Sequence, residues 1–180
     1  MATRNKLFIP DNIYFITFTI LGWKQIFIND EYCNLVYRWF DYIKERYSNK
    51  IHGYIIMPNH IHVLILITNQ SQKLSKLIQN AKRFLAYEII SLLTKENKND
   101  MLHFFSSYAN VKKHAKHKIF EDRFDSKLVD ANLFREKLEY IHNNPCKGQW
   151  HLSETPEEYK YSSASNYILG NGLYKIDAVS

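Results

Sequence analysis

Apolar side chains recur along this chain with two periods, one typical of strands and the other typical of helices. Residues 13–21 are rich in Tyr, Phe, Ile and Thr, and this composition predicts a first strand. After Asn29 and Asp30, which are candidate helix caps, apolar residues stand three or four positions apart. This spacing predicts an amphipathic helix whose inward residues are Leu35, Val36, Trp39, Phe40, Ile43 and Tyr47.

Two more strands are predicted on either side of a break at Pro58 and Asn59. The first covers residues 51–57, and the second covers residues 60–68. Beyond His62, both sets of alternating positions in the second strand are apolar. Because a strand with two apolar faces is covered on both sides, this strand is expected to lie at the centre of a sheet.

The second half of the chain continues with a helix, a strand and a further helix. Residues 73–93 have helical spacing, and residues 119–129 alternate enough to predict a fourth strand. Asp130 is a candidate cap for the last long helix, which Pro145 ends. Residues 103–108 predict a short irregular strand. A short helix after Thr155-Pro156 is predicted to carry Tyr159, Tyr161 and Tyr167.

The order of the main elements is strand, helix, strand, strand, helix, strand. It predicts an α+β fold with the split βαβ arrangement of a ferredoxin-like domain, an antiparallel sheet and an appended C-terminal helix. We expect one domain over residues 1–180, with a core at about 13–145 and a C-terminal tail at 146–180. The appended helix is expected to lie across one face of the sheet.

Composition adds a partner class and a compartment. The 180 residues are 46% hydrophobic and 15% aromatic, which suits a sizeable core and not a disordered chain. A formal net charge of +6 favours a polyanionic partner such as nucleic acid. Cys33 and Cys146 form no CxxC pair, so neither a disulfide framework nor a cysteine zinc cluster is indicated. A reducing cytoplasm is the expected compartment.

The sequence predicts neither an export signal nor a membrane span. Residues 1–6 carry two basic residues without the long apolar run of a signal peptide behind them. The most hydrophobic stretch, residues 53–68, is interrupted by His60 and His62 and falls short of the ~18 apolar residues of a membrane helix. We therefore expect a soluble protein without a membrane partner.

Two short motifs carry candidate chemistry. Residues two apart in a strand point to the same face, so His60 and His62 present two imidazoles side by side. Imidazole is a common metal ligand. In a helix, residues four apart stand one above the other, so Tyr140 and Asn144 are expected to face the same metal. Either motif alone is more often structural, and only their combination indicates an active site.

These groups favour phosphoryl transfer. A tyrosine with a pKa near ~10 is a weak nucleophile at neutral pH and needs help from a metal or a base. A divalent ion held by two neutral imidazoles and an amide oxygen keeps positions open for a phosphate oxygen and water. Such an ion would neutralise the nonbridging oxygens while Tyr140 attacks the phosphorus in line.

Three strings of residues resemble the signatures of a known family. They are Met-Pro-Asn-His-Ile-His-Val-Leu at 57–64, Tyr-Ile-His-Asn-Asn-Pro at 140–145 and Tyr-Lys-Tyr-Ser-Ser-Ala at 159–164. In this order they are similar to the REP-associated tyrosine transposases, in the single-tyrosine branch of the His-hydrophobic-His nuclease superfamily. The resemblance spans about residues 13–169. The turn at 146–150 departs from the family's usual run of small and apolar residues.

The resemblance implies an enzyme that cleaves and rejoins single-stranded DNA, usually at imperfect palindromes folded as hairpins. It implies that His60 and His62 are metal ligands and that Tyr140 attacks to give a 5′-phosphotyrosine and a free 3′-hydroxyl. A second DNA 3′-hydroxyl can then reverse the attack and complete strand transfer without ATP. The implied ion is Mg²⁺ or Mn²⁺, and the protein is expected to act as a monomer or a homodimer.

The third metal ligand has more than one candidate. In related enzymes a polar side chain four residues after the tyrosine completes the metal site, which here selects Asn144. We expect Pro145 to push Asn144 away from helical geometry, and Asn143 is the second candidate. His142 lies near the opposite side of the helix and is expected to pack or to contact DNA.

DNA contacts are predicted from charge, because no motif assigns them. The basic candidates lie on the second helix, in a lysine-rich segment and on the predicted fourth strand, and are Lys82, Arg83, Lys112, Lys113, Arg123 and Lys127. Trp150 and Tyr161 are expected to pack in the core, with stacking on unpaired bases as the alternative.

Two other functions stay open at this point. One is a metal-dependent phosphodiesterase in which water attacks and Tyr140 only positions the substrate. The other is a DNA-hairpin binding protein without catalysis, which the basic charge favours and the intact His60, His62 and Tyr140 oppose.

Overall fold

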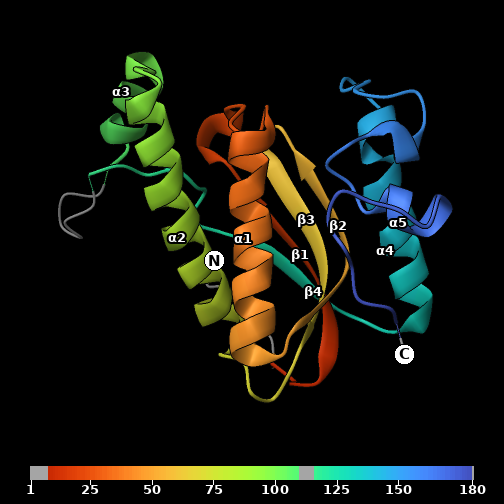
Figure 1. Cartoon of the computed structure of the whole chain (residues 1–180). Helices are drawn as coiled ribbons and strands as arrows, with labels where there is room; N and C mark the ends of the chain where they lie inside the picture. The colour runs from red at the N-terminus through yellow and green to blue at the C-terminus, as the bar shows by residue number, and fades with distance from the viewer. Residues whose placement is uncertain (1–7, 110–115, 180) are drawn as a thin grey trace.

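A four-stranded antiparallel sheet forms the centre of the molecule in the computed structural model, which describes residues 8–109 and 116–179. Its strands are β1 (Asn12–Thr19), β2 (Lys50–Met57), β3 (His60–Ile67) and β4 (Asp125–Val129). They lie in the order β2-β3-β1-β4, with every neighbouring pair antiparallel (Figure 1). This order confirms the predicted ferredoxin-like, α+β arrangement, with β3 at the centre of the sheet.

Two helical layers cover the sheet. The long helices α1 (Asp30–Tyr47) and α2 (Leu74–Lys95) lie on one face, and α4 (Ala131–Asn143) with the short α5 (Ala164–Ile168) lies on the other (Figure 1). Because side chains alternate along a strand, β3 sends Ile61 and Val63 into the larger core and Leu64 into the smaller one. This double burial is the physical reason for its unbroken apolar sequence.

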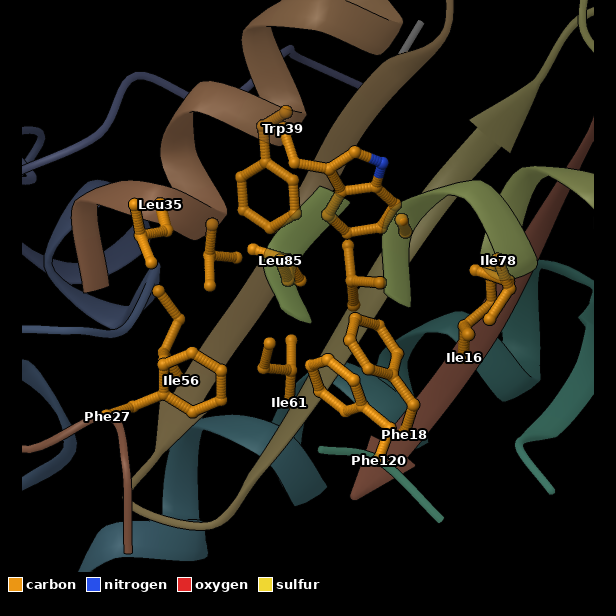
Figure 2. Close-up of a cluster of buried hydrophobic side chains, with 14 of the residues drawn as sticks. Ile16, Phe18, Phe27, Leu35, Trp39, Ile56, Ile61, Ile78, Leu85 and Phe120 are labelled. Atoms are coloured by element: carbon orange, nitrogen blue, oxygen red, sulfur yellow. The ribbon is translucent and has the colours of Figure 1, made fainter. Parts of the chain in front are cut away.

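The larger core is dense in aromatic and branched side chains. Figure 2 shows it packed between the sheet and helices α1 and α2, with the labelled residues Ile16, Phe18, Phe27, Leu35, Trp39, Ile56, Ile61, Ile78, Leu85 and Phe120. Each large apolar side chain that is fully buried contributes about 1.5–3 kcal/mol to folding. This cluster therefore stabilises the scaffold that holds the opposite face of the sheet in place.

Two predicted caps set where the long helices begin. The Asn29 side chain accepts a hydrogen bond from the Tyr32 N–H, and the Asp130 carboxylate accepts one from the Leu133 N–H. Each bond satisfies a backbone donor that the first helical turn leaves unpaired. The start of α4, and with it the position of Tyr140 on its surface, is thus determined locally.

The predicted strand at 103–108 was wrong, because residues 103–107 belong to α3 (Asn99–Ser107) and Tyr108 is the C-cap of this helix. This helix follows α2 and buries Phe105 in the larger core, while His103 stays exposed. In so short a segment, a sequence pattern with one inward aromatic residue also fits the alternation of a strand. The contact between α3 and the core, which joins distant parts of the chain, decides the outcome.

The predicted strand at 119–129 was too long. Regular pairing is confined to β4, and upstream of it only a single bridge joins Ile20 to Phe120. Between the two, backbone carbonyls of residues 121–123 accept hydrogen bonds from the Lys82 side chain. The pairing with β1 is interrupted where these carbonyls bind Lys82 of α2.

The C-terminal tail returns to the free edge of β2. Ser162 bridges to Ile55, and the Tyr54 carbonyl accepts a hydrogen bond from the Ser163 N–H at 3.0 Å. An open sheet edge exposes unpaired backbone groups, and the tail covers part of this one. The motif at 159–164 therefore has a structural role here.

The predicted helix after Thr155 is shorter than expected. It is a single 3-10 turn, η4 (Pro156–Glu158), and Tyr167 belongs to the separate helix α5. Tyr159 and Tyr161 lie between the two, where the Tyr161 hydroxyl donates to Asp30 and ties the tail to the start of α1. No helix within residues 8–109 and 116–179 has the length and apolar content needed to cross a membrane.

We predict that Gly53 allows α4 to lie close to β2. A Cβ atom at this position would lie 2.8 Å from Leu138 Cδ1 and 3.4 Å from Ile141 Cδ1, both on α4. Gly53→Val should therefore lower the free energy of unfolding by about 1–3 kcal/mol, because the helix must move outward. Urea denaturation measures this loss, with Gly53→Ala as a smaller step in the same series. Equal midpoints for the wild type and both variants would contradict the close-packing account.

Candidate active site

His60 and His62 lie on the face of β3 that α4 covers. They pair with Thr19 and Thr17 of β1, and their ring centroids are 4.7 Å apart. Both side chains are buried, with 7% and 5% of their surface exposed. The sequence prediction that the two imidazoles share one face is therefore correct in geometry.

Each imidazole is held by a hydrogen bond at Nδ1. His60 Nδ1 lies 2.6 Å from Asn59 Oδ1, and His62 Nδ1 lies 2.6 Å from Thr17 Oγ1. An amide oxygen only accepts, so His60 Nδ1 carries the hydrogen and Nε2 keeps its lone pair. In the same tautomer of His62, Nδ1–H donates to Thr17 Oγ1, and the lone pair of Nε2 is left available to a metal ion. Histidines that bind metals are usually oriented by such a second hydrogen bond.

Burial keeps both rings in the neutral form that metal binding requires. Loss of solvation lowers the pKa of His60 to about 4. It lowers the pKa of His62 to about 3, and the nearby His60 and Lys137 add repulsion against a second positive charge. At neutral pH the two imidazoles are therefore uncharged bases.

One atom of this pair lacks a partner. His62 Nε2 is buried and makes no hydrogen bond within the described part of the chain. A buried polar atom without a partner costs roughly 1–3 kcal/mol, and a bound cation would satisfy it. The donor set therefore fits a divalent metal.

A third protein ligand would have to be a side chain other than His, Cys, Asp or Glu. Among residues 8–109 and 116–179, no cluster of three His, Cys, Asp or Glu side chains is placed to hold a metal. The amide oxygens of Asn144 and Asn143, the predicted candidates, are donors of that other type.

Tyr140 on α4 lies beside the histidines. Its ring centroid is 5.4 Å from that of His62, and half of its surface, 50%, is exposed. Phe15 packs against both, because it stacks on His62 at 5.4 Å and meets Tyr140 edge-on at 6.2 Å. The structure thus brings the predicted tyrosine and the predicted histidines together, with the tyrosine open to solvent.

A positive charge lies next to this tyrosine. Lys137 Nζ is 5.6 Å from the ring centroids of both Tyr140 and Phe15, and it pairs with Glu136 at 2.9 Å. Lys137 was not among the predicted residues. Its position three residues before Tyr140, on the same side of the helix, is the signal that could have found it.

The expectation that Pro145 displaces Asn144 from helical geometry was wrong. Asn144 has φ −57° and ψ −45°, and Pro145 continues the chain into the 3-10 turn η3 (Asn144–Cys146). Pro145 is buried, and its carbonyl accepts a hydrogen bond from the Leu152 N–H, so tertiary contacts hold this turn. Asn144 therefore remains one helical turn beyond Tyr140.

The two asparagines differ in their contacts. The Asn143 amide nitrogen donates to the Glu139 carbonyl at 2.8 Å, which turns this side chain back along the helix. The side chain of Asn144 is half-buried. The role of Asn144 as third ligand stays a prediction, and the bond that engages the Asn143 amide favours Asn144 over Asn143.

His142 packs inside the protein, one of its two predicted roles. It is buried, and its Nε2 lies 2.8 Å from Ser163 Oγ, which also accepts a hydrogen bond from the Tyr54 N–H. Burial lowers the pKa of His142 to about 4. This residue joins α4 to the tail and to β2.

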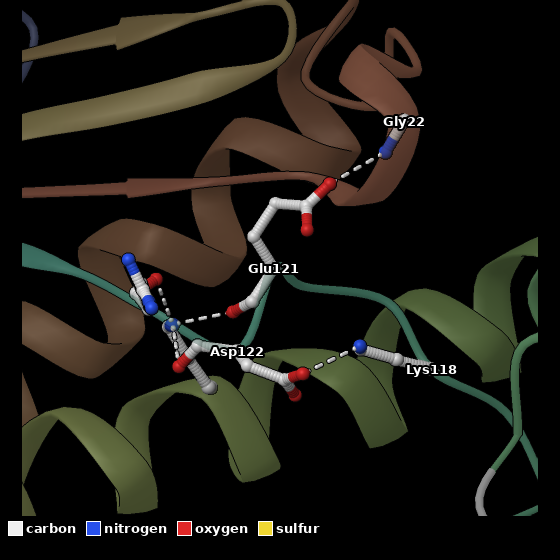
Figure 3. A network of polar contacts seen from close by, with 6 residues as sticks. Gly22, Lys118, Glu121 and Asp122 are labelled. Carbon is white, nitrogen blue, oxygen red and sulfur yellow. Dashed lines mark hydrogen bonds and ion pairs between the residues drawn. The ribbon is translucent and has the colours of Figure 1, made fainter. Parts of the chain in front are cut away.

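The predicted DNA contacts fall in different places. Lys82 Nζ donates to the carbonyls of Glu121 and Arg123 at 2.8 and 2.9 Å, and burial lowers its pKa to about 8. Its ammonium group fastens the loop before β4, where Glu121 also binds Gly22 and Asp122 pairs with Lys118 (Figure 3). Lys82 therefore has a structural role that the sequence did not indicate.

The other basic candidates are exposed or lie elsewhere. Lys127 pairs with Phe15 in the sheet, so it stands on the same face as the histidines. Arg123 is exposed in the loop before β4, and Arg83 is exposed on α2, in the helical layer on the opposite side of the sheet. Lys112 and Lys113 lie outside the described residues.

Three residues that orient the histidines were also missed. Asn59 stands in the recognised motif but was interpreted only as a strand break, and Thr17 and Phe15 belong to β1. Alternation along β1 places Phe15 and Thr17 on one face, and this was the available signal. Their pairing with β3 cannot be read from local sequence.

Comparisons with known proteins identify a similar fold and a family. The chain is similar in structure to a REP-associated tyrosine transposase bound to a REP hairpin, with 16% identity and a TM-score of 0.68 over 100% of this chain and 92% of that one. A structure described as a candidate transposase from Deinococcus radiodurans R1 has 14% identity and a TM-score of 0.49 over 79% of this chain and 97% of that one. Comparison with curated proteins gave no match.

The family model for IS200-like transposases matches residues 13–144. The matched segment runs from β1 to the last turn of the tyrosine helix and includes both histidines. At 16% identity, the likeness to the REP-associated enzyme establishes the fold, and the family model establishes the membership. This chain belongs to the IS200-like transposase family.

Proposed function

We propose that this transposase cleaves and rejoins single-stranded DNA through a covalent bond to Tyr140. The observation that carries the proposal is the contact between a half-exposed tyrosine and a buried histidine pair, with 5.4 Å between the Tyr140 and His62 ring centroids. A tyrosine open to solvent on one side and next to two metal-type ligands on the other can receive a phosphate between them.

In the proposed reaction, the Tyr140 oxygen attacks the phosphorus of a phosphodiester. The bond from phosphorus to O3′ breaks, the tyrosine hydroxyl loses its proton and the departing O3′ gains one. The products are a 5′-phosphotyrosine and a free 3′-hydroxyl. Because the phosphodiester energy is kept in the tyrosine bond, a second 3′-hydroxyl can reverse the attack and join new strands.

We propose that His60, His62 and Asn144 hold Mg²⁺ or Mn²⁺. The unpartnered His62 Nε2 and the hydrogen bonds of both rings at Nδ1 support this assignment. When bound, the ion would supply Lewis-acid chemistry by neutralising the nonbridging oxygens of the phosphate. The hydrogen bonds of Asn59 and Thr17 with the two rings would orient the imidazole lone pairs toward the ion, and Lys137 adds positive charge beside the tyrosine.

The proposed substrate is a DNA hairpin with a single-stranded flank. The related solved structure is of an enzyme bound to a REP hairpin, and this chain carries a net charge of +6. We propose that Lys127 contacts the phosphate backbone, and its exposure on the histidine face supports this role. The protein is proposed to act as a monomer or a homodimer.

Replacement of the tyrosine tests the covalent step. Tyr140→Phe should lower formation of the DNA adduct by at least about 10³-fold, because only the attacking oxygen is removed. Binding of the same hairpin should change by no more than about twofold. Denaturing electrophoresis with a labelled hairpin and Mn²⁺ measures the adduct. Cleavage without any adduct in the wild type would favour hydrolysis by water, and binding without cleavage would favour an inactive hairpin-binding protein.

Replacement of a histidine tests the metal site. His62→Ala should lower Mn²⁺ affinity by more than the roughly 10–100-fold loss that follows removal of an orienting partner, and Thr17→Val should lie within that range. Isothermal titration with Mn²⁺ measures both without any DNA. His103→Ala, at an exposed position on α3, is the matched control and should bind as the wild type does. Unchanged affinity in His62→Ala would remove this residue from the site.

The two asparagines are separated by a paired comparison. Asn144→Ala should lower Mn²⁺ affinity and metal-dependent cleavage together by about 10-fold or more, because a ligand is lost. Asn143→Ala should leave both near the wild-type values, since its amide is engaged by the helix backbone. The opposite pattern, measured by the same titration and adduct assay, would assign the third ligand to Asn143.

A further inference from the structure

Trp23 is an exposed indole at the rim of the candidate active site. It ends the 3-10 turn η1 (Leu21–Trp23), which leads from β1 toward α1. Its side chain is 64% exposed, and its ring centroid lies 6.2 Å from that of His60. Trp39, by contrast, is buried in the larger core, and Trp150 is partly buried against the smaller core, with its ring centroid 6.3 Å from that of His60. Those two side chains belong to the hydrophobic cores, whereas Trp23 packs in neither core.

The backbone at Trp23 is strained. Gly22 and Trp23 have φ values of 61° and 56°, both in the left-handed region. Glycine adopts this conformation freely, but a bulky residue there is an outlier that the surrounding structure must enforce. Such outliers concentrate at functional sites. A strained position that presents an apolar ring to solvent contributes little to folding, so another role has to account for it.

Hydrogen bonds on three sides hold this turn rigid. Gly22 N–H donates to Glu121 Oε1 at 3.0 Å (Figure 3), and Trp23 N–H donates to the Ile20 carbonyl at 3.0 Å. The Trp23 carbonyl accepts from Asn59 Nδ2 at 3.3 Å, and the same asparagine binds the His60 ring through Oδ1. The indole and the imidazole are therefore positioned by one shared side chain.

Glycine at position 22 also fits tight packing beneath the turn. A Cβ atom there would lie 2.8 Å from Phe104 Cζ of α3. Lys24, directly after Trp23, places its ammonium 4.5 Å from the centroid of the same Phe104 ring. The turn is thus packed on one side and open on the other, where the indole projects next to His60.

We propose that Trp23 stacks on an unpaired base of the single-stranded DNA, next to the phosphate that Tyr140 attacks. This proposal rests on the proposed function and adds the residue that positions the strand. A rigid, uncharged indole offers a wide π-face that any base can stack on, which suits a strand with no paired partner. Because Trp23 contacts His60, the stacked base belongs to a nucleotide close to the reacting phosphate.

Binding measurements test the proposal without the chemical step. In a Tyr140→Phe background, Trp23→Gly should weaken binding of a synthetic DNA hairpin with single-stranded tails by about 5- to 100-fold. Trp23→Phe should recover most of that loss, because a ring is restored. Tyr87→Ala removes a tyrosine that is 73% exposed on α2, away from the histidine face, and should bind like the parent.

Stability separates stacking from a structural role. Glycine adopts a positive φ without strain, so Trp23→Gly should unfold at the same urea concentration as the parent or at a higher one. If the indole had a structural role, Trp23→Gly would unfold at a lower urea concentration than the parent. It would also lose the same factor in affinity for every DNA probe. A shift in oligomeric state on size-exclusion chromatography without loss of DNA affinity would assign Trp23 to a contact between copies and overturn the proposal.

Abasic substitutions locate the stacked base. Removing one base at a time from the single-stranded tail should weaken binding by the parent at one position, and Trp23→Gly should show no further loss there. Equal affinity of parent and Trp23→Gly for every probe would overturn the stacking proposal even if the wild type forms the tyrosine adduct. Absence of an adduct in the wild type would instead overturn the proposed function, while the binding comparison still decides the role of Trp23.

Discussion

The alternation of side chains along β3 is the constraint on which both the fold and the candidate site depend. One face of the strand places Ile61 and Val63 in the core under α1 and α2, and the other presents His60 and His62 to α4. A register shift of one residue would exchange these faces, placing imidazoles in the aliphatic core and isoleucine at the site. The free energy that stabilises the sheet therefore also holds the histidines in position.

The candidate nucleophile lies where the apolar stripe of α4 ends. Leu138 and Ile141 pack toward Gly53 and Leu64, whereas Tyr140, on the adjacent surface of the helix, stays half exposed. Burial keeps the imidazoles neutral, and exposure keeps the tyrosine accessible to a polyanion. A helix that covered the histidine face completely would make the tyrosine inaccessible. A helix that left this face uncovered would expose the imidazoles to solvent and allow them to take up protons.

Hydrogen bonds between distant segments hold the turn at Trp23 in place beside the histidines. Asn59 joins the His60 ring to the turn at Trp23, and Glu121 joins that turn to the loop before β4. Lys82 in turn holds this loop through its backbone carbonyls. These hydrogen bonds link the His60 ring, the turn at Trp23 and the loop before β4 to one another. Such linkage is expected of a site that must be rigid before its substrate binds.

Local sequence was sufficient for the order of the main elements, for the caps at Asn29 and Asp130, and for the shared face of His60 and His62. These features depend on strand and helix periodicity and on contacts between residues a few positions apart, which a sequence displays directly. The recognised motifs added the family, and the IS200-like match over residues 13–144 confirmed it. Only the tertiary structure decided that residues 103–107 are helical, that Asn144 keeps a helical backbone before Pro145, and that Lys82 supports a loop. The helix at 103–107 and the role of Lys82 depend on partners far away in the chain, and the backbone at Asn144 depends on the buried Pro145 and its hydrogen bond with Leu152. In all three, burial and hydrogen bonding in the folded chain outweigh local preference.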